Sequence, residues 1–274
     1  MNCRKKMIVS VVFCLYVLYV LPSIAQTRTV FTIGGNYWYA QRKLSGDYYL
    51  NGEIESKSGN MVGPYLNLRI GNLILGASAF WGTFSESNIN HLQQSIDYYK
   101  IPAKRTDING SLGYSLINNP GFSLTVFGAV KTMNMNRDYT TTYTDAQSVK
   151  WDTDGKYDET GTLLGGGVSC VIRFPESPIF IFGSASYLQG NRNFKYTISY
   201  NGEELEGWGF DDTGTAQLSA LSGGIGFQTG SNISILVGYR ADIFDFKLDR
   251  KNVSNYTGRE NLGGLSVTMA YTFR

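Results

Sequence analysis

The single histidine of the sequence, His91, is the first residue to consider for catalysis, because imidazole changes charge near neutral pH. Ser95 and Asp97 follow it closely along the chain. The segment from Asn90 to Tyr99 is predicted as a short helix that Pro102 ends. A His-x-Ser or Asp-x-His spacing, which would place both groups on one face of a strand, is absent. We therefore expect no catalytic residues and a protein that is not an enzyme.

The acidic residues at 152–159 are the second candidate for a functional site, in this case one that binds a metal ion. Asp152, Asp154, Asp158 and Glu159 surround Gly155 in a spacing that partly matches a calcium-binding loop. One acidic position of that pattern is missing, and calcium takes about six to eight oxygen ligands. Asp-Gly is also a signal for a hairpin turn. The sequence therefore favours a solvated hairpin tip here, and we expect no metal site and no cofactor.

Six charged residues form the third candidate, because they fall on the less apolar face of otherwise apolar segments. They are Arg69, Asp107, Lys131, Arg173, Arg240 and Asp242. A charge in a protein interior must be paired or hydrated. Two interpretations follow: a lining that selects small anions or polar solutes, or a network of charges that neutralise one another and fill the interior. In a narrow interior we favour the network.

These charges lie in segments that alternate apolar and polar residues with a period of two, the pattern of β-strands. Val126, Cys170 and Val237 fall on the apolar face, whereas Ser111 falls on the opposite face among small and polar residues. The alternation predicts an all-β protein. Its ten candidate strands lie near 31–39, 65–70, 73–84, 108–116, 122–131, 164–174, 179–189, 217–229, 233–243 and 265–273.

Short and long connections alternate between these strands. The short ones lie at 71–72, 117–121, 175–178 and 230–232, and the long polar ones lie near 44–61, 85–103, 135–159, 191–215 and 247–259. Three long connections contain a signal for the type I′ hairpin turn: Asn51-Gly52, Asp154-Gly155 and Asn201-Gly202. We therefore expect the strands to continue into these connections as hairpins.

The N-terminal 25 residues have the layout of a secretory signal peptide. Arg4, Lys5 and Lys6 precede an apolar run at 7–21, and Ser23-Ile24-Ala25 then provides the small-x-small pattern of a cleavage site. The sequence predicts a cleaved signal peptide at 1–25 and a single domain at 26–274.

Cleavage after Ala25 would change both the cysteine count and the charge. Cys3 and Cys14 would leave with the signal, so Cys170 would have no partner for an intramolecular disulfide. Removing three of the 24 basic residues leaves 21 against 22 acidic ones, a net charge of −1. A chain this close to neutrality has no electrostatic footprint for nucleic acid.

The strand pattern and the rhythm of connections resemble the bacterial outer-membrane β-barrel superfamily. The last strand, Leu265-x-Val267-x-Met269-x-Tyr271-x-Phe273, is similar to the terminal signal that barrel-assembly machinery reads, although Arg274 follows the final aromatic residue. The resemblance covers residues 26–274. It implies an antiparallel up-and-down transmembrane β-barrel of ten strands, with strands extended into extracellular hairpins. A soluble β-sandwich is the alternative, but its outer face would normally be polar.

The resemblance also guides the expected function. The omptin proteases of this superfamily are ten-stranded and use Asp-Asp and Asp-His pairs, and this chain has no Asp-x-His. The leading hypothesis is a surface scaffold or accessory subunit of a membrane complex, because the strands extend into outer hairpins and a ten-stranded barrel is too narrow for a general porin. A narrow porin-like channel for small solutes is the alternative, followed by an outer-membrane hydrolase. The expected location is the outer membrane with both termini periplasmic. Expected partners are membrane lipid and lipopolysaccharide, the assembly machinery during insertion, and other envelope proteins.

Overall fold

A computed structural model describes residues 29–46, 52–87, 101–144, 150–205, 209–230, 232–249 and 256–273. The predicted signal peptide and the segment that contains His91, Ser95 and Asp97 lie outside these residues, so the short helix and the cleavage site stay predictions. No helix in the described ranges is long and apolar enough to cross a membrane.

The described residues form antiparallel strands joined in sequence order. The strands are β1 (Thr29–Gly46), β2 (Gly52–Ile70), β3 (Leu73–Ser87), β4 (Ile101–Asn118), β5 (Phe122–Thr144), β6 (Lys150–Arg173), β7 (Ile179–Tyr200), β8 (Glu203–Glu204), β9 (Phe210–Thr229), β10 (Ile233–Asp249) and β11 (Tyr256–Phe273). The two-residue β8 pairs only with the end of β7, so ten long strands build the main sheet.

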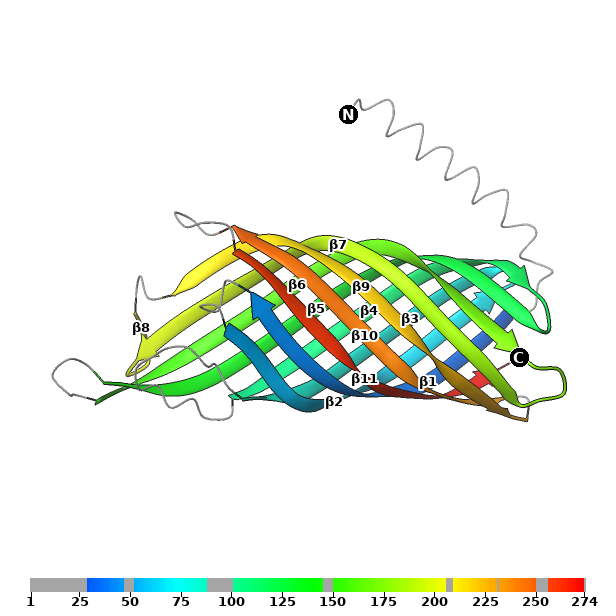
Figure 1. Cartoon of the computed structure of the whole chain (residues 1–274), viewed down its shortest axis with the longest axis horizontal. Helices are drawn as coiled ribbons and strands as arrows, with labels where there is room; N and C mark the ends of the chain where they lie inside the picture. Colours follow the sequence, from blue (N-terminus) through cyan, green and yellow to red (C-terminus); the bar gives the residue numbers. More distant parts are fainter. Residues whose placement is uncertain are drawn as a thin grey trace, which may run out of the picture.

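The ten long strands close into a barrel (Figure 1). Each strand pairs with its neighbours in the sequence, and β1 pairs with β11 from Phe31↔Phe273 to Gly46↔Gly258. The pairing of β6 with β7 completes the ring, so the main sheet has no free edge. The prediction of an antiparallel ten-stranded barrel is confirmed.

The short connections gather at one end of the barrel, which we call the short-turn end (Figure 1). The start of β1 and the end of β11 lie at the same end, because Phe31 pairs with Phe273. The opposite end carries the strand extensions. There, Asn201 and Gly202 form a two-residue turn with φ values of 51° and 83°, as a type I′ hairpin requires, so this predicted turn is confirmed.

The prediction of a hairpin tip at Asp154-Gly155 is wrong. Both residues lie inside β6, where Gly155 pairs with Tyr139 of β5 and with Ile198 of β7. Pairing on both sides of the strand overrides the local turn preference of Asp-Gly. The acidic residues at 152–159 therefore run along a strand instead of encircling an ion: Asp154 is exposed, whereas Glu159 is fully buried in the interior.

The outer surface changes character along the barrel axis. Toward the short-turn end it is apolar, and its exposed residues include Ile33, Leu66, Leu112, Val126, Val168, Ile181, Ile225, Val237 and Leu265. Exposed aromatic residues such as Tyr37, Trp81 and Tyr239 lie farther along the strands, and Phe31, Phe174 and Phe273 lie near the short-turn end. An apolar band between aromatic girdles is the lipid-facing surface of outer-membrane barrels.

Beyond the band, the strands reverse their polarity. Their outer face carries exposed polar residues such as Lys104, Asn134 and Asn193, and their inner face carries buried apolar side chains together with buried charged ones. Trp38 and Phe84 do not belong to the exposed aromatic girdles. Both are completely buried inside the barrel, within an apolar cluster that also contains Met61, Phe80 and Met135.

Candidate functional site

All six charged residues singled out in the sequence lie on the inner face of the barrel, but in two separate groups. Asp107, Lys131, Arg240 and Asp242 meet near the middle of the barrel. Arg69 is the penultimate residue of β2 and Arg173 is the last residue of β6, so both lie at the short-turn end. The two groups therefore have different neighbours and different possible roles.

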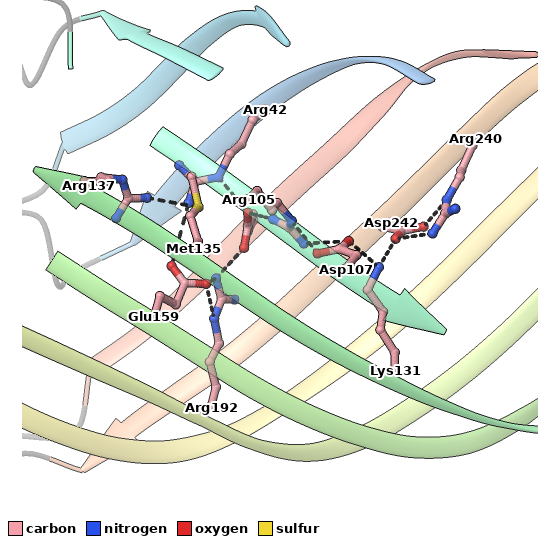
Figure 2. Close-up of polar contacts among 11 residues, drawn as sticks. Arg42, Arg105, Asp107, Lys131, Met135, Arg137, Glu159, Arg192, Arg240 and Asp242 are labelled. Carbon is pink, nitrogen blue, oxygen red and sulfur yellow. Dashed lines mark hydrogen bonds and ion pairs between the residues drawn. The ribbon is translucent and has the colours of Figure 1, made fainter. Parts of the chain in front are cut away.

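The central group forms a chain of ion pairs across the lumen (Figure 2). Lys131 Nζ of β5 lies 2.9 Å from Asp107 Oδ2 of β4 and 2.5 Å from Asp242 Oδ2 of β10. Arg240, two residues before Asp242 on the same face of β10, donates to the same carboxylate at 2.9 Å and 3.1 Å. Lys131 thus connects strands from distant parts of the sequence.

This chain continues into a second group of charges that the sequence analysis did not identify. Glu260 of β11 accepts hydrogen bonds from Arg42 Nε and Arg105 Nη1, each at 2.6 Å, and from Arg192. Arg192 Nε also donates to Glu159 at 2.9 Å. We call the network of these nine residues the buried charge cluster: Arg42, Arg105, Asp107, Lys131, Glu159, Arg192, Arg240, Asp242 and Glu260.

Arg105 and Asp107 join the central group to the charges around Glu260. They lie two residues apart on β4, and Arg105 Nε donates to Asp107 Oδ1 at 2.8 Å. A strand places residues i and i+2 on one face, so Arg105-x-Asp107 forms the same local pair as Arg240-x-Asp242. The repeated Arg-x-Asp spacing is therefore the sequence signal that identifies Arg105 as an inward-facing partner of Asp107. Arg42, Glu159, Arg192 and Glu260 have no such neighbour, and only the closed barrel brings them together.

Aromatic rings separate and shield the charges of the cluster. The Phe244 ring lies 5.4 Å from the charged groups of Arg105, Lys131 and Arg192. Arg240 lies over the rings of Trp38 and Phe80, at 4.5 and 4.8 Å. Cation–π contacts of this kind offset part of the cost of removing a cation from water. The lumen is consequently filled at this level by charged and aromatic side chains together.

Apolar packing extends the filled region. One apolar cluster includes Leu44, Leu163, Phe194, Phe246 and Leu248, which are at most 4% exposed. The apolar cluster that contains Trp38 and Met135 lies alongside the same charges, since Arg240 lies over the rings of Trp38 and Phe80. Protein interiors packed in this way leave few voids larger than a water molecule. The lumen beyond the middle of the barrel is therefore a packed core.

Toward the short-turn end the interior is hollow. A cavity of about 610 Å³ extends from Lys131, Arg240 and Asp242 to Arg69 and Arg173. Its wall is formed largely by small and polar residues, Ser111 among them, as the alternation predicted for this face. The lumen is thus divided into a closed half beside the buried charge cluster and an open half beside the short turns.

Sequence comparisons assign no family. No protein-family model matches the chain, and no curated protein is detectably similar to it.

Solved structures do match the fold. The outer-membrane protease OmpT from Escherichia coli matches over 89% of this chain and 97% of that chain, with a TM-score of 0.58 and 9% identity. The toluene transporter TbuX of Ralstonia pickettii matches over 90% of each chain, with a TM-score of 0.42 and 10% identity. The translocator domain of the autotransporter NalP from Neisseria meningitidis matches over 97% of each chain, with a TM-score of 0.41 and 11% identity.

The fold is that of the small bacterial outer-membrane β-barrels. Within that class, the match to the protease rests on the path of the backbone, because only 9% of the aligned residues are identical. A fold shared at this level of identity hosts different functions, which depend on the side chains of the interior and the surface.

Proposed function

We propose that the chain is a non-enzymatic, non-conducting barrel of the bacterial outer membrane that acts as a surface scaffold or accessory subunit of a membrane complex. The packed half of the lumen carries this proposal. Arg42, Arg105, Glu159, Arg192 and Glu260 have fully buried side chains there, held by one another and by aromatic rings. A solute that crossed the barrel would have to break this network.

The long strands support a role at the surface. β6 has 24 residues, whereas a tilted strand needs about 9–11 residues to cross a bilayer. More than half of β6 is therefore available outside the apolar band, where its outward side chains are polar. In this proposal the short-turn end faces the periplasm together with both termini, lipid and lipopolysaccharide contact the band, and other envelope proteins bind the extension.

A narrow channel is the second candidate, and the open half of the lumen favours it. Its cavity of about 610 Å³ would be the periplasmic vestibule of such a channel. In the scaffold proposal the same cavity is blind, because Lys131, Asp242 and Arg240 close its inner end.

Transport measurements separate the two candidates. Liposomes that contain the purified protein should not swell in solutions of a monosaccharide or disaccharide, and planar bilayers should show no steady single-channel current. Vesicles with a general porin at the same protein density are the positive control, and a shift on unheated gels reports that the barrel is folded. Rapid swelling with a disaccharide would replace the scaffold proposal by the channel.

Cysteine labelling tests the proposed orientation. Cysteine at Gly202, in the exposed hairpin turn, should react with a membrane-impermeant thiol reagent on intact cells. Cysteine at Asn119, in a short turn, should react only after the cells are opened, and cysteine at Gly155 should stay unreactive because that position faces the packed interior. The native Cys170 lies between the outward-facing Val168 and Ile172 and should be silent. Labelling at Asn119 but not at Gly202 on intact cells would reverse the orientation.

Purification tests the accessory role itself. When the barrel is isolated from its native membrane in a mild detergent, specific envelope proteins should co-purify with it. These proteins should be lost when polar outward residues beyond the apolar band, such as Lys104 and Asn193, are changed to alanine. Recovery of the barrel alone under conditions that preserve other membrane complexes would contradict the accessory role.

A further inference from the structure

The cavity at the short-turn end has walls rich in hydroxyl and amide groups. Thr268 Oγ1 donates to Asn36 Oδ1 at 2.6 Å, and the hydroxyl groups of Ser184 and Ser222 are 2.8 Å apart. Asn67 lies on the same wall. Groups of this kind both donate and accept hydrogen bonds, as a ligand with several hydroxyl groups requires. The volume of about 610 Å³ is within the usual range for a small-molecule site.

The charge of the cavity is unbalanced. Among the described residues that line it, four are cationic, namely Arg69, Lys131, Arg173 and Arg240, and Asp242 is the one carboxylate. Asp242 is already bound by Lys131 and Arg240 at the inner end. The cations at the outer end are therefore not neutralised by the cavity wall, and the cavity favours negative ligands.

The two outer arginines lie at the mouth of the cavity. Each is partly exposed, and each ends or nearly ends its strand at the short turns. Arg69 Nε donates to the carbonyl oxygen of Gly71 at 2.9 Å, but its Nη2 atom is buried without a hydrogen-bond partner. In the described parts of the chain neither arginine forms an ion pair, and the two guanidinium groups repel each other. The guanidinium groups at the mouth therefore keep hydrogen-bond donors that no carboxylate of the described residues uses.

We propose that this cavity binds a small anion that carries hydroxyl groups, such as a sugar acid or a sugar phosphate, which enters at the short-turn end. Its carboxylate or phosphate lies beside Arg69 and Arg173, because a guanidinium group binds either anion through two parallel hydrogen bonds. Its hydroxyl groups contact the serine, threonine and asparagine side chains of the wall. The site is independent of the scaffold role, since it needs only the open half of the lumen.

Calorimetry on the folded full-length protein in a non-ionic detergent tests this site. The probes are glucuronate, glucose 6-phosphate, glucose and inorganic phosphate. Glucuronate and glucose 6-phosphate should bind, glucose should give no measurable binding, and inorganic phosphate should bind more weakly than glucose 6-phosphate. Equal affinity for inorganic phosphate and glucose 6-phosphate would overturn the role of the hydroxyl-rich wall.

Variants locate the binding. The double variant that combines Arg69→Gln with Arg173→Gln should bind glucose 6-phosphate about ten-fold or more weakly, because charge-assisted hydrogen bonds are lost. Arg259→Gln is the matched control, because Arg259 is exposed on the outer surface near the opposite end of the barrel and pairs with Asp245 at 2.6 Å. The Arg259→Gln variant should bind glucose 6-phosphate as the parent protein does. If the double variant does not fold, Arg173→Gln alone gives the same comparison. Unchanged binding in the arginine variants, or no binding of any anion by the folded parent, would overturn the proposal.

Discussion

Replacing Glu260 by glutamine should destabilise the barrel by about 3–5 kcal/mol, the usual cost of removing one member of a buried ion pair. The Glu260 carboxylate contacts Arg42, Arg105 and Arg192, and all four side chains are fully buried. Glutamine keeps the size and one acceptor oxygen but removes the negative charge. The three guanidinium groups would then repel one another in a region that water does not reach, so the free energy of the folded state would rise relative to that of the unfolded state.

Urea-induced unfolding in lipid vesicles, followed by tryptophan fluorescence, measures this effect. Asp245→Asn is the matched control, because Asp245 pairs with Arg259 on the exposed outer surface and exposed pairs contribute little. The urea concentration at the midpoint of unfolding should fall strongly for Glu260→Gln and stay close to the parent value for Asp245→Asn. Equal small shifts would indicate that water reaches the cluster and that the lumen is not packed at that level.

Replacing Val237 by arginine should lower the free energy of unfolding by about 2–4 kcal/mol if this position lies near the middle of the bilayer. Val237 is 45% exposed on the outer face, and it pairs with Val267 and with Ile225 in the middle of the apolar band. Val126 occupies the equivalent place on β5 and is 37% exposed, so Val126→Arg should have a similar effect. The guanidinium group would face hydrocarbon with no hydrogen-bond partner within reach.

Ser111→Arg is the control for this prediction, because Ser111 lines the open half of the lumen where water can hydrate a charge. The loss of stability, measured by urea unfolding in the same vesicles, should be clearly smaller at Ser111 than at Val126 or Val237. Equal losses at the three positions would mean that the inward and outward faces have been assigned wrongly, or that the band does not contact lipid.

Local sequence signals were reliable where one periodicity dominates. Alternation with a period of two placed Lys131 and Asp242 inside and Val126 and Val237 outside, because each residue on a strand faces opposite to the next. The Asn201-Gly202 turn was equally predictable, since both residues readily adopt positive φ values and nothing opposes them at an exposed tip. The same argument failed at Asp154-Gly155, where two neighbouring strands hold the backbone extended.

The sequence by itself determined the class of fold, the number of long strands, and which side chains face inward in the apolar band. Only the tertiary structure decided what the inward side chains contact. Glu260 meets Arg42, Arg105 and Arg192 because closure of β1 on β11 and of β6 on β7 brings four strands around one point, and no local spacing encodes that meeting. The division of the lumen into a packed half and an open half has the same origin. Periodicity fixes the direction of a side chain, whereas packing depends on which side chains of other strands share its level in the barrel.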